Sequence, residues 1–468
     1  MRHERVKTRF APSPTGELHI GGARTALFNF LLARGRGGRF VLRIDDTDEE
    51  RSKPEYEKQL IEDLRWLRLH WDEGPGDGSS VPYRQSERRT FYEENLRSLR
   101  KEGKVYPCFC SEKRLEALRG EQHSRGEPPR YDGLCRRLTP EEARRRIDGG
   151  EIPCWRFSLP DAAIAFDDQV RGRQSFTPES MGDFVVARSD GHPTYLFASV
   201  IDDHLMEITH IVRGDEHVPN TARQQAIFDA LGWEAPVYAH IPMILSHDRQ
   251  KLSKRTGSTP IRRYREEGYL PEALSAYLST LSWTPPDSIE KGSLLSLDET
   301  ASVFSLSRVS ASSPIHDETH LNYWQKEAMG KRGGGFALGR LKEADPRFGA
   351  FDPAALERLI DDLLEEHYTL PLLKNTLSFL VEKPGDTALD VTEPWKRELM
   401  DALRSVDPWS DENLNQVLRG FMKERGLKGK EFFHPLRLIF TGQERGAALP
   451  LVMWALGREE VMSRLERQ

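Results

Sequence analysis

One stretch near the start of the chain, residues 8–32, constrains the fold more than any other. It begins with a short apolar run that is typical of a buried strand, turns through Pro12, Pro14 and Gly16, and continues in a helical pattern. His19-Ile20-Gly21-Gly22 lies where that helix should begin. The amino end of a helix favours anions, and glycine lets a ligand approach the backbone closely. The stretch therefore predicts a strand, a tight turn and a helix that together receive a phosphate group.

The segments that follow predict an open α/β sheet. Residues 40–44 form an apolar run typical of a second buried strand, and residues 56–69 carry apolar side chains on one helical face. This alternation predicts a parallel, doubly wound sheet. Residues 199–206, 208–213 and 236–245 are expected to return to it as strands. The sequence contains neither a GxGxxG nor a Walker A pattern, so we expect a nucleotide site of another kind.

Length and composition limit the class of protein. A chain of 468 residues is long for one compact domain, which predicts several units. The sequence is 37% hydrophobic and 30% charged. Because it contains no apolar run of about 18 residues, we expect a soluble, cytoplasmic protein without a membrane span. Four cysteines are too few for a disulfide scaffold in a chain of this size, and the net charge of −6 confines nucleic-acid binding to local basic patches.

A series of motifs along nearly the whole chain resembles the class I glutamyl-tRNA synthetases. Arg9-Phe10-Ala11-Pro12-Ser13-Pro14-Thr15-Gly16 opens the series, followed by residues 18–24 with a HIGH-like motif. Further matches are residues 45–48, 61–67, 71–74, 202–204, 213–217, 251–255 (a KMSKS-like motif), 435–437, 441–442 and 456–459. A single four-residue motif would be weak evidence. The ordered series at family spacing is specific.

The resemblance implies four segments. A Rossmann-like catalytic domain would comprise residues 1–92 and 196–248, and an inserted α+β domain, residues 93–195, would bind the acceptor end of the tRNA. A stem-contact region with the lysine loop would follow at residues 249–330. Residues 331–468 would form an all-helical anticodon-binding domain.

The residues themselves support some of these expectations. Asp190-Gly191 between apolar runs predicts a hairpin turn. Asp352-Pro353 predicts a helix start, and the glycine-rich residues 330–335 predict a linker or a mobile turn. Two apolar stripes predict helices that pack into a core: Leu356, Leu359, Ile360, Leu363 and Leu364, and then Leu414, Val417, Leu418, Phe421 and Met422, ended by Gly426.

The activity implied by the resemblance is ATP-dependent ligation of L-glutamate to tRNA-Glu. The α-carboxylate of glutamate would attack the α-phosphate of ATP, and the terminal ribose hydroxyl of the tRNA would then attack the glutamyl-adenylate. Such chemistry depends on positioning and charge stabilisation rather than on a protein nucleophile. We expect Mg²⁺ to accompany ATP and the protein to be a monomer.

The implied site residues fall into three groups. Those for catalysis are His19, Lys251 and Lys254, and those for ATP are Pro12, Ser13, His19, Gly21, Gly22 and Lys254. Those for glutamate are Arg9, Ala11, Ser13, Asp45, Tyr195, Ser199 and Arg213. Arginine suits a carboxylate because its planar guanidinium donates paired hydrogen bonds. Asp45 stands where many members have Glu to receive the α-amino group, and Ser199 replaces a frequent Asn.

Three cysteines suggest a zinc site. Cys108, Cys110 and Cys135 have suitable spacing, but structural zinc takes four ligands. Relatives with the metal place histidine at the position of Arg137, so Tyr131 or His123 would have to substitute. The alternative is a metal-free knuckle with buried thiols.

Three other functions remain open. A nucleotidylyltransferase could use the same histidine and lysine motifs, although it would not need about 140 helical residues at its carboxyl end. A tRNA-binding protein without activity is a second alternative, against which the intact His19, Lys251 and Lys254 argue. A duplicate or non-discriminating synthetase that charges tRNA-Gln with glutamate is the third.

Overall fold

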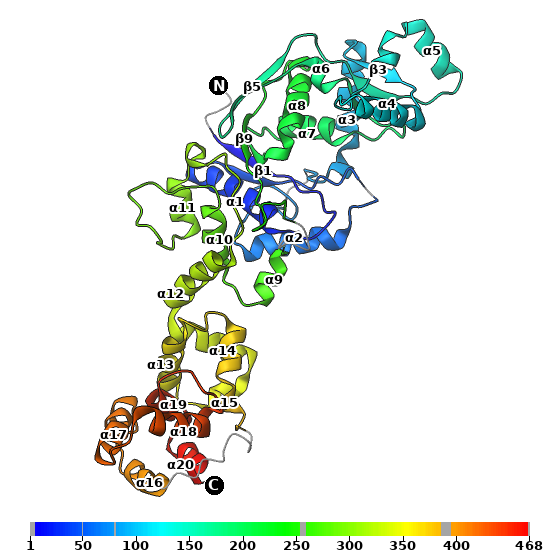
Figure 1. The fold of residues 1–468 in the computed structure, drawn as a ribbon. Helices are drawn as coiled ribbons and strands as arrows, with labels where there is room; N and C mark the ends of the chain where they lie inside the picture. The colour runs from blue at the N-terminus through cyan, green and yellow to red at the C-terminus, as the bar shows by residue number, and fades with distance from the viewer. Residues whose placement is uncertain (1–4, 49, 79–80, 253–258, 385–394, 467–468) are drawn as a thin grey trace. The chain divides into compact units, whose positions relative to one another are not determined.

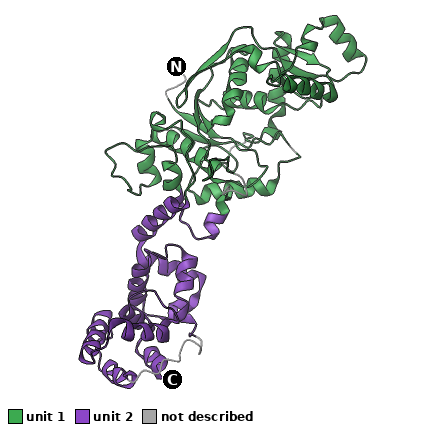
Figure 2. Cartoon of the chain, in the orientation of Figure 1, with its two compact units in different colours: residues 1–262, 275–317 green, residues 263–274, 318–468 purple. Residues whose placement is uncertain are grey.

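The computed structural model describes residues 5–48, 50–78, 81–252, 259–384 and 395–466. The chain forms two compact units, coloured green and purple in Figure 2. Unit 1 comprises residues 1–262 and 275–317, and unit 2 comprises residues 263–274 and 318–468. None of the helices in the described ranges is both long and apolar enough to cross a lipid bilayer.

Unit 1 is built on a six-stranded sheet with the order β2-β1-β8-β9-β5-β6. Four strands come from segments predicted to form it: β1 (Lys7–Phe10), β2 (Arg39–Leu42), β8 (His210–Gly214) and β9 (Val237–Ile241). They run parallel, as predicted. The other two are β5 (Ile164–Asp168), which is parallel to β9, and β6 (Gly172–Phe176), which pairs antiparallel with β5. The main sheet thus gains an edge hairpin from the middle of the chain.

Helices connect the parallel strands (Figure 1). Helix α1 (Ile20–Gly35) links β1 to β2, α2 (Pro54–Trp66) follows β2, and α8 (Val218–Ala230) links β8 to β9. Helix α1 is buried along most of its length because it packs on β1 and on α11 (Leu297–Val303). Gly35 permits the second contact, since a Cβ there would lie 2.1 Å from the carbonyl oxygen of Ala301.

One predicted strand is wrong. Residues 199–205 lie within helix α7 (Tyr195–Leu205) and Met206 is its C-cap, so the segment is not in the sheet. Phe197, Ala198, Val200 and Ile201 are all buried there. A short run that is buried on every side looks the same in a strand and in a helix, so periodicity could not separate them. The turn predicted at Asp190-Gly191 is present, with Gly191 at φ +85°, but a single bridge between Ala187 and Pro193 replaces the second strand.

A smaller antiparallel sheet precedes α7. Its order is β3-β4-β7, with β3 (Val105–Cys108), β4 (Cys154–Phe157) and β7 (Phe184–Ala187). The helices of the same part of the chain are α3 (Arg89–Lys101), α4 (Glu112–Ser124), α5 (Pro140–Asp148) and α6 (Pro178–Met181). The four predicted domain boundaries stay predictions, although β5 and β6 join the main sheet from within the predicted insertion.

All regular elements in the described part of unit 2 are helices, as predicted. The chain passes between the units within α9 (Ile261–Glu266) and α10 (Pro271–Thr280). The remaining helices are α12 (Glu318–Ala344), α13 (Pro353–Leu363), α14 (Leu370–Thr376), α15 (Ser378–Val381), α16 (Lys396–Arg404), α17 (Asp411–Glu424), α18 (Gly429–Thr441), α19 (Leu449–Leu456) and α20 (Arg458–Glu466).

Local signals in unit 2 were read correctly, with one exception. The Asp352 side chain accepts a hydrogen bond from the N–H of Ala355 at 2.8 Å, as predicted for an N-cap. The two apolar stripes belong to α13 and α17 and enter one core. The glycine run is not a linker. Two helical segments of α12 meet within it at Gly333, whose backbone is not helical and whose φ is +74°.

Candidate active site

A cavity of about 290 Å³ lies at the carboxyl ends of β1 and β8. Eight predicted site residues line it: Arg9, Ala11, His19, Gly21, Gly22, Tyr195, Arg213 and Lys251. They come from the end of β1, the start of α1, the start of α7, the end of β8 and the segment after β9. In open α/β sheets ligands bind outside the carboxyl ends of the strands, so this cavity is the candidate site.

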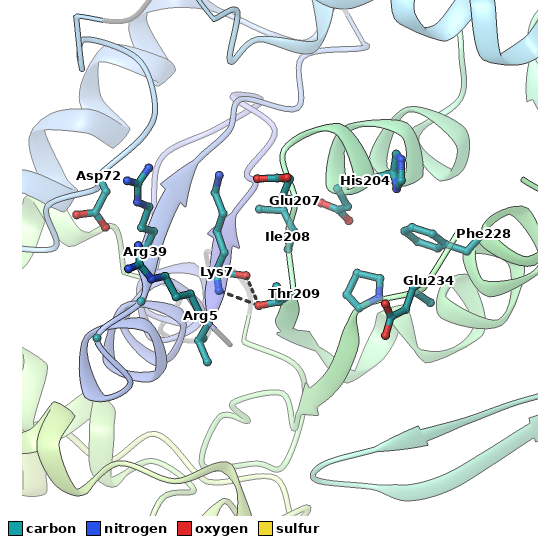
Figure 3. A pocket seen from close by; sticks show the side chains of 16 residues that line it. Arg5, Lys7, Arg39, Asp72, His204, Glu207, Ile208, Thr209, Phe228 and Glu234 are labelled. Carbon is teal, nitrogen blue, oxygen red and sulfur yellow. Dashed lines mark hydrogen bonds between the residues drawn. The ribbon is translucent and has the colours of Figure 1, made fainter. Parts of the chain in front are cut away.

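A larger cavity, of about 550 Å³, lies at the opposite ends of the same strands. Figure 3 shows Arg5, Lys7 and Arg39 on one side of it and Glu207 and Glu234 on the other. It contains none of the residues predicted for chemistry or substrate binding. The smaller cavity therefore remains the candidate.

His19 caps helix α1 with its side chain. Its Nδ1 accepts a hydrogen bond from the N–H of Gly22 at 3.3 Å, which leaves the proton of a neutral ring on Nε2. The side chain is exposed at the mouth of the cavity. The surrounding walls nevertheless desolvate the ring and lower its pKa, and Lys251 lowers it further. A neutral His19 thus presents an N–H donor beside the positive end of α1, where a phosphate oxygen would be stabilised.

Both ends of the lysine loop reach this part of unit 1. Lys251 lines the cavity and forms a bridge with Leu245. At the other end Pro260 forms a bridge with His19, and the N–H of Ile261 donates to the carbonyl oxygen of Leu18 at 2.8 Å. Lys254 itself lies outside the described residues. The loop nevertheless begins and ends beside the histidine motif that precedes it by more than 200 residues.

Arg213 is a buried cation that four acceptors surround. Its Nε donates to Nε2 of His240 at 3.2 Å and its Nη1 to the Tyr195 hydroxyl at 3.2 Å. Its Nη2 donates to Thr221 Oγ1 at 2.5 Å and to Gln224 Oε1 at 2.6 Å. The guanidinium is therefore fixed in one orientation.

Arg9 belongs to a buried charge network. Its Nε donates to Asp203 Oδ1 at 3.1 Å, and Nη1 of Arg43 donates to the same oxygen at 2.7 Å. Arg43 also donates to both oxygens of Asp45, at 2.7 and 3.3 Å. Burial would raise the pKa of Asp203, but Arg9 and Arg43 outweigh it and lower that pKa. Asp203 is therefore ionised and holds the two arginines side by side.

Four predicted contacts do not line the cavity. The Asp45 carboxylate is paired with Arg43 rather than open to a ligand, and burial raises its pKa to about 6. Ser199 is buried in α7, and its hydroxyl has no hydrogen-bond partner among the described residues. Pro12 and Ser13 lie on the turn beyond the cavity wall. Asp45 is drawn away from the cavity because an arginine two residues earlier competes for its carboxylate.

Sequence reasoning missed several residues of the wall. Arg24 donates to the carbonyl oxygens of Pro242 and Leu281, so it ties α1 to two distant segments. Glu216 is the acidic residue among the described residues that line the cavity. His217 packs beside Tyr195, and burial together with Arg213 lowers its pKa to about 3. Glu216 and His217 belong to a matched motif, but nothing in the sequence places them toward the cavity.

The three predicted metal cysteines are brought together. Thiols of Cys108, Cys110 and Cys135 lie within 4.8 Å of one another. The Tyr131 hydroxyl lies 3.5 Å from the sulfurs of both Cys108 and Cys110, and the Cys110 and Cys135 sulfurs are 3.6 Å apart. Arg137, at the family's histidine position, instead donates to the carbonyl oxygen of Asp132. Tyr131 therefore takes the fourth place in this cluster.

Comparison with known proteins agrees with the motifs. The family model for the catalytic domain of class I tRNA synthetases (E and Q) matches residues 5–323, and an anticodon-binding-domain model matches residues 339–468. Glutamate–tRNA ligase 2 of Syntrophus aciditrophicus is 40% identical over 100% of this chain and 98% of the relative. The glutamate–tRNA ligase of Heliobacterium modesticaldum is 42% identical over 99% of this chain and 97% of the relative.

A solved structure extends this likeness to the whole fold. The crystal structure of a glutamate tRNA ligase from Elizabethkingia meningosepticum, in complex with its amino acid, matches with a TM-score of 0.88. It is 31% identical and the match covers 99% of both chains. The chain therefore belongs to the glutamate–tRNA ligase family of class I tRNA synthetases.

Proposed function

We propose that this protein activates L-glutamate with ATP and transfers it to the 3′ end of tRNA-Glu. The observation that carries the proposal is that one cavity is lined by His19 and Lys251 and also by Arg9 and Arg213. It occurs in a chain whose full-length relatives are glutamate–tRNA ligases at 40–42% identity. Groups suited to bind phosphate and groups suited to bind carboxylate thus line the same cavity.

The first step needs no protein nucleophile. An α-carboxyl group has a pKa of about 3.5 and is ionised at neutral pH, so glutamate itself supplies the attacking oxygen. Arg9 and Arg213 hold its carboxylates, while the Nε2–H of His19 donates to an oxygen of the reacting phosphate. Lys251 and Lys254 neutralise charge on the leaving pyrophosphate, with Mg²⁺ carried in by ATP. Each group acts by position and charge.

The ammonium group of glutamate needs an anionic partner. Asp45 is the candidate from the sequence, and Glu216 is the candidate from the cavity wall. Because Arg43 already occupies the Asp45 carboxylate, we favour Glu216. Glu216→Gln should raise the KM for glutamate by about tenfold or more, as expected for a lost charge-assisted hydrogen bond. A larger effect of Asp45→Asn on that KM, with the fold preserved, would instead favour Asp45.

We also propose that the cysteine cluster binds zinc. Zn–S bonds of about 2.3 Å in a tetrahedron place sulfurs about 3.8 Å apart, and Cys110 and Cys135 are 3.6 Å apart. Three thiols and the Tyr131 phenol make a complete set of four donors. Such a closed site would stabilise the fold around β3 and take no part in the reaction.

Aminoacylation with radioactive glutamate tests the function directly. Purified tRNA-Glu and tRNA-Gln are offered separately with ATP. Charging of tRNA-Glu alone supports the proposal, charging of both indicates a non-discriminating ligase, and charging of tRNA-Gln alone indicates a specialised duplicate. Binding of tRNA without any charging would leave only a tRNA-binding protein. Gel filtration of the same sample tests the expected monomer.

A further inference from the structure

We propose that Asp168 and His240 are positioning residues that orient Arg213 toward the bound amino acid. The inference rests on the proposed function, because it assigns a role in glutamate binding. Neither residue lines the cavity. Both are buried, His240 completely, so any effect on a substrate must pass through Arg213.

The three side chains form a continuous chain of hydrogen bonds. Asp168 Oδ2 lies 2.6 Å from Nδ1 of His240, and Nε2 of the same ring lies 3.2 Å from Nε of Arg213. An arginine nitrogen can only donate, so Nε2 of His240 must be an acceptor. The ring proton is therefore on Nδ1, where the carboxylate of Asp168 accepts it. Asp168 thus stabilises the neutral tautomer of His240 whose Nε2 can accept a hydrogen bond from Arg213.

The charge state of Asp168 is fixed by its own surroundings. Its Oδ1 accepts from the backbone N–H groups of Val170 and Arg171 at 2.9 and 2.8 Å. The backbone N–H of His240 donates to both of its oxygens, at 3.2 and 3.0 Å. Burial opposes ionisation, but the hydrogen bonds outweigh it and lower the pKa of Asp168. The carboxylate is thus a permanent acceptor.

The fold supplies Asp168 by means of the added hairpin. Asp168 is the last residue of β5, and Gly172, at φ +69°, begins β6 after a tight turn. Strand β5 pairs with β9 at Asp168 and Tyr238, two residues before His240. This register aligns the carboxylate with the histidine ring. The edge hairpin therefore has a role at the site although none of its residues lines the cavity.

A purely structural ion pair is the alternative to a positioning role. Asp168→Asn separates the two. The asparagine oxygen can keep the backbone hydrogen bonds of Val170 and Arg171, while its NH₂ group then faces Nδ1 of His240. That arrangement moves the ring proton to Nε2, where Thr221 Oγ1 at 2.8 Å can accept it but the N–H of Arg213 at 3.2 Å loses its acceptor. The fold can survive while the orientation of Arg213 is lost.

The test is steady-state aminoacylation by the full-length protein. For Asp168→Asn we expect the KM for glutamate to rise about 10- to 100-fold, the loss expected when a charge-assisted hydrogen bond is misaligned, while the KM for ATP and for tRNA changes by less than about twofold. Asp167→Asn is the matched control. It makes the same change one residue earlier on β5, where the side chain is 74% exposed, and should leave all three constants unchanged.

A double variant and a spectrum complete the test. Once Arg213 is replaced by alanine, Asp168→Asn should raise the glutamate KM no further. An additional increase, or an equal rise in all three KM values, would overturn the proposal. If Asp168→Asn does not fold, ¹⁵N shifts of histidine in the wild-type protein decide, with His240→Gln used to assign the signal. A proton on Nε2 overturns the proposal and a proton on Nδ1 supports it. Absence of any glutamate charging by the wild type would refute the proposed function instead.

Discussion

Replacing Asp203 by asparagine would measure how much the buried charges beneath the site stabilise unit 1. One oxygen of Asp203 accepts from Arg9 at 3.1 Å and from Arg43 at 2.7 Å. The side chains of Asp203, Arg9 and Arg43 are 2%, 5% and 0% exposed. Asparagine keeps the size and one acceptor oxygen but removes the negative charge. The variant therefore tests the charge and not the packing.

The expected loss follows from the two arginines. Removing one partner of a buried ion pair costs about 3–5 kcal/mol, because the remaining charge is left without compensation. Asp45 still neutralises part of Arg43, so we expect the lower end, about 3 kcal/mol of the free energy of unfolding of unit 1. The pKa of Asp203 is lowered in the folded protein. Its stabilising effect is therefore complete above the unfolded pKa of about 4, declines as the pH falls below that value, and is lost only below the lowered pKa of the folded protein.

Native-state hydrogen exchange is the suitable assay, because two units need not unfold together and a single melting curve would mix them. The slowest amides of β1 report the stability of the main sheet. Wild type and Asp203→Asn are compared at pH 7, with Asp167→Asn as an exposed control expected to change little. A difference below about 1 kcal/mol at pH 7 would refute the reasoning. So would a difference that does not shrink as the pH falls below about 4, where the carboxylate of the unfolded chain becomes protonated and the folded one does not yet.

Three further predictions concern other parts of the chain. Lys254→Ala should cut adenylate formation by about 100-fold or more while tRNA binding persists, as ATP–pyrophosphate exchange and filter binding would show; near-normal exchange contradicts its role. Tyr131→Phe should lower the zinc content of protein purified without added metal, measured by mass spectrometry. A zinc content near zero in both the wild type and the variant would indicate a metal-free knuckle. Gly334→Ala should destabilise unit 2 by about 1–3 kcal/mol, because its Cβ would lie 2.4 Å from the carbonyl oxygen of Glu357, whereas Gly339→Ala in the same helix meets nothing within 4 Å and should be neutral or stabilising in urea denaturation.

The part of the site that could be predicted consists of local signals. His19, Gly21 and Gly22 predict the start of a helix within four residues of sequence, and helix α1 begins there in the structure. The Asp352 cap and the stripe on α13 are equally local. In each case the residues that determine the feature are neighbours in the sequence, so one stretch contains the whole argument.

The parts that could not be predicted depend on distant partners. His240 and Asp168 are 72 positions apart, and Arg9 and Asp203 are 194 apart. Nothing in the sequence near Asp168 indicates that its carboxylate will form a hydrogen bond with a histidine on another strand. The same reason applies to Asp45. Arg43, which binds its carboxylate, is close in sequence, but Arg43 is itself held by Asp203, which is 160 positions away. Which buried charges pair with one another is decided by the tertiary fold and not by the local sequence.

Arg213 and Arg9 differ in how many of their hydrogen-bond donors are free to bind a ligand. Arg213 gives Nε to His240, both Nη2 hydrogens to Thr221 and Gln224, and one Nη1 hydrogen to Tyr195. A guanidinium has five N–H groups, so the described residues leave one of them for a ligand. The Tyr195 hydroxyl accepts from Arg213 and can donate its own hydrogen beside it.

Arg9 differs, because the described residues take only its Nε. Arg9 lines the cavity, and its two Nη groups have no hydrogen-bond partner among these residues. In the proposed function Arg9 would bind one carboxylate through paired hydrogen bonds, and Arg213 and Tyr195 would together bind the other. A dicarboxylic amino acid satisfies both arrangements at once. Under the proposed function, an amino acid with a single carboxylate would leave one set of buried donors unpaired, and we propose this cost as the basis of selectivity for glutamate.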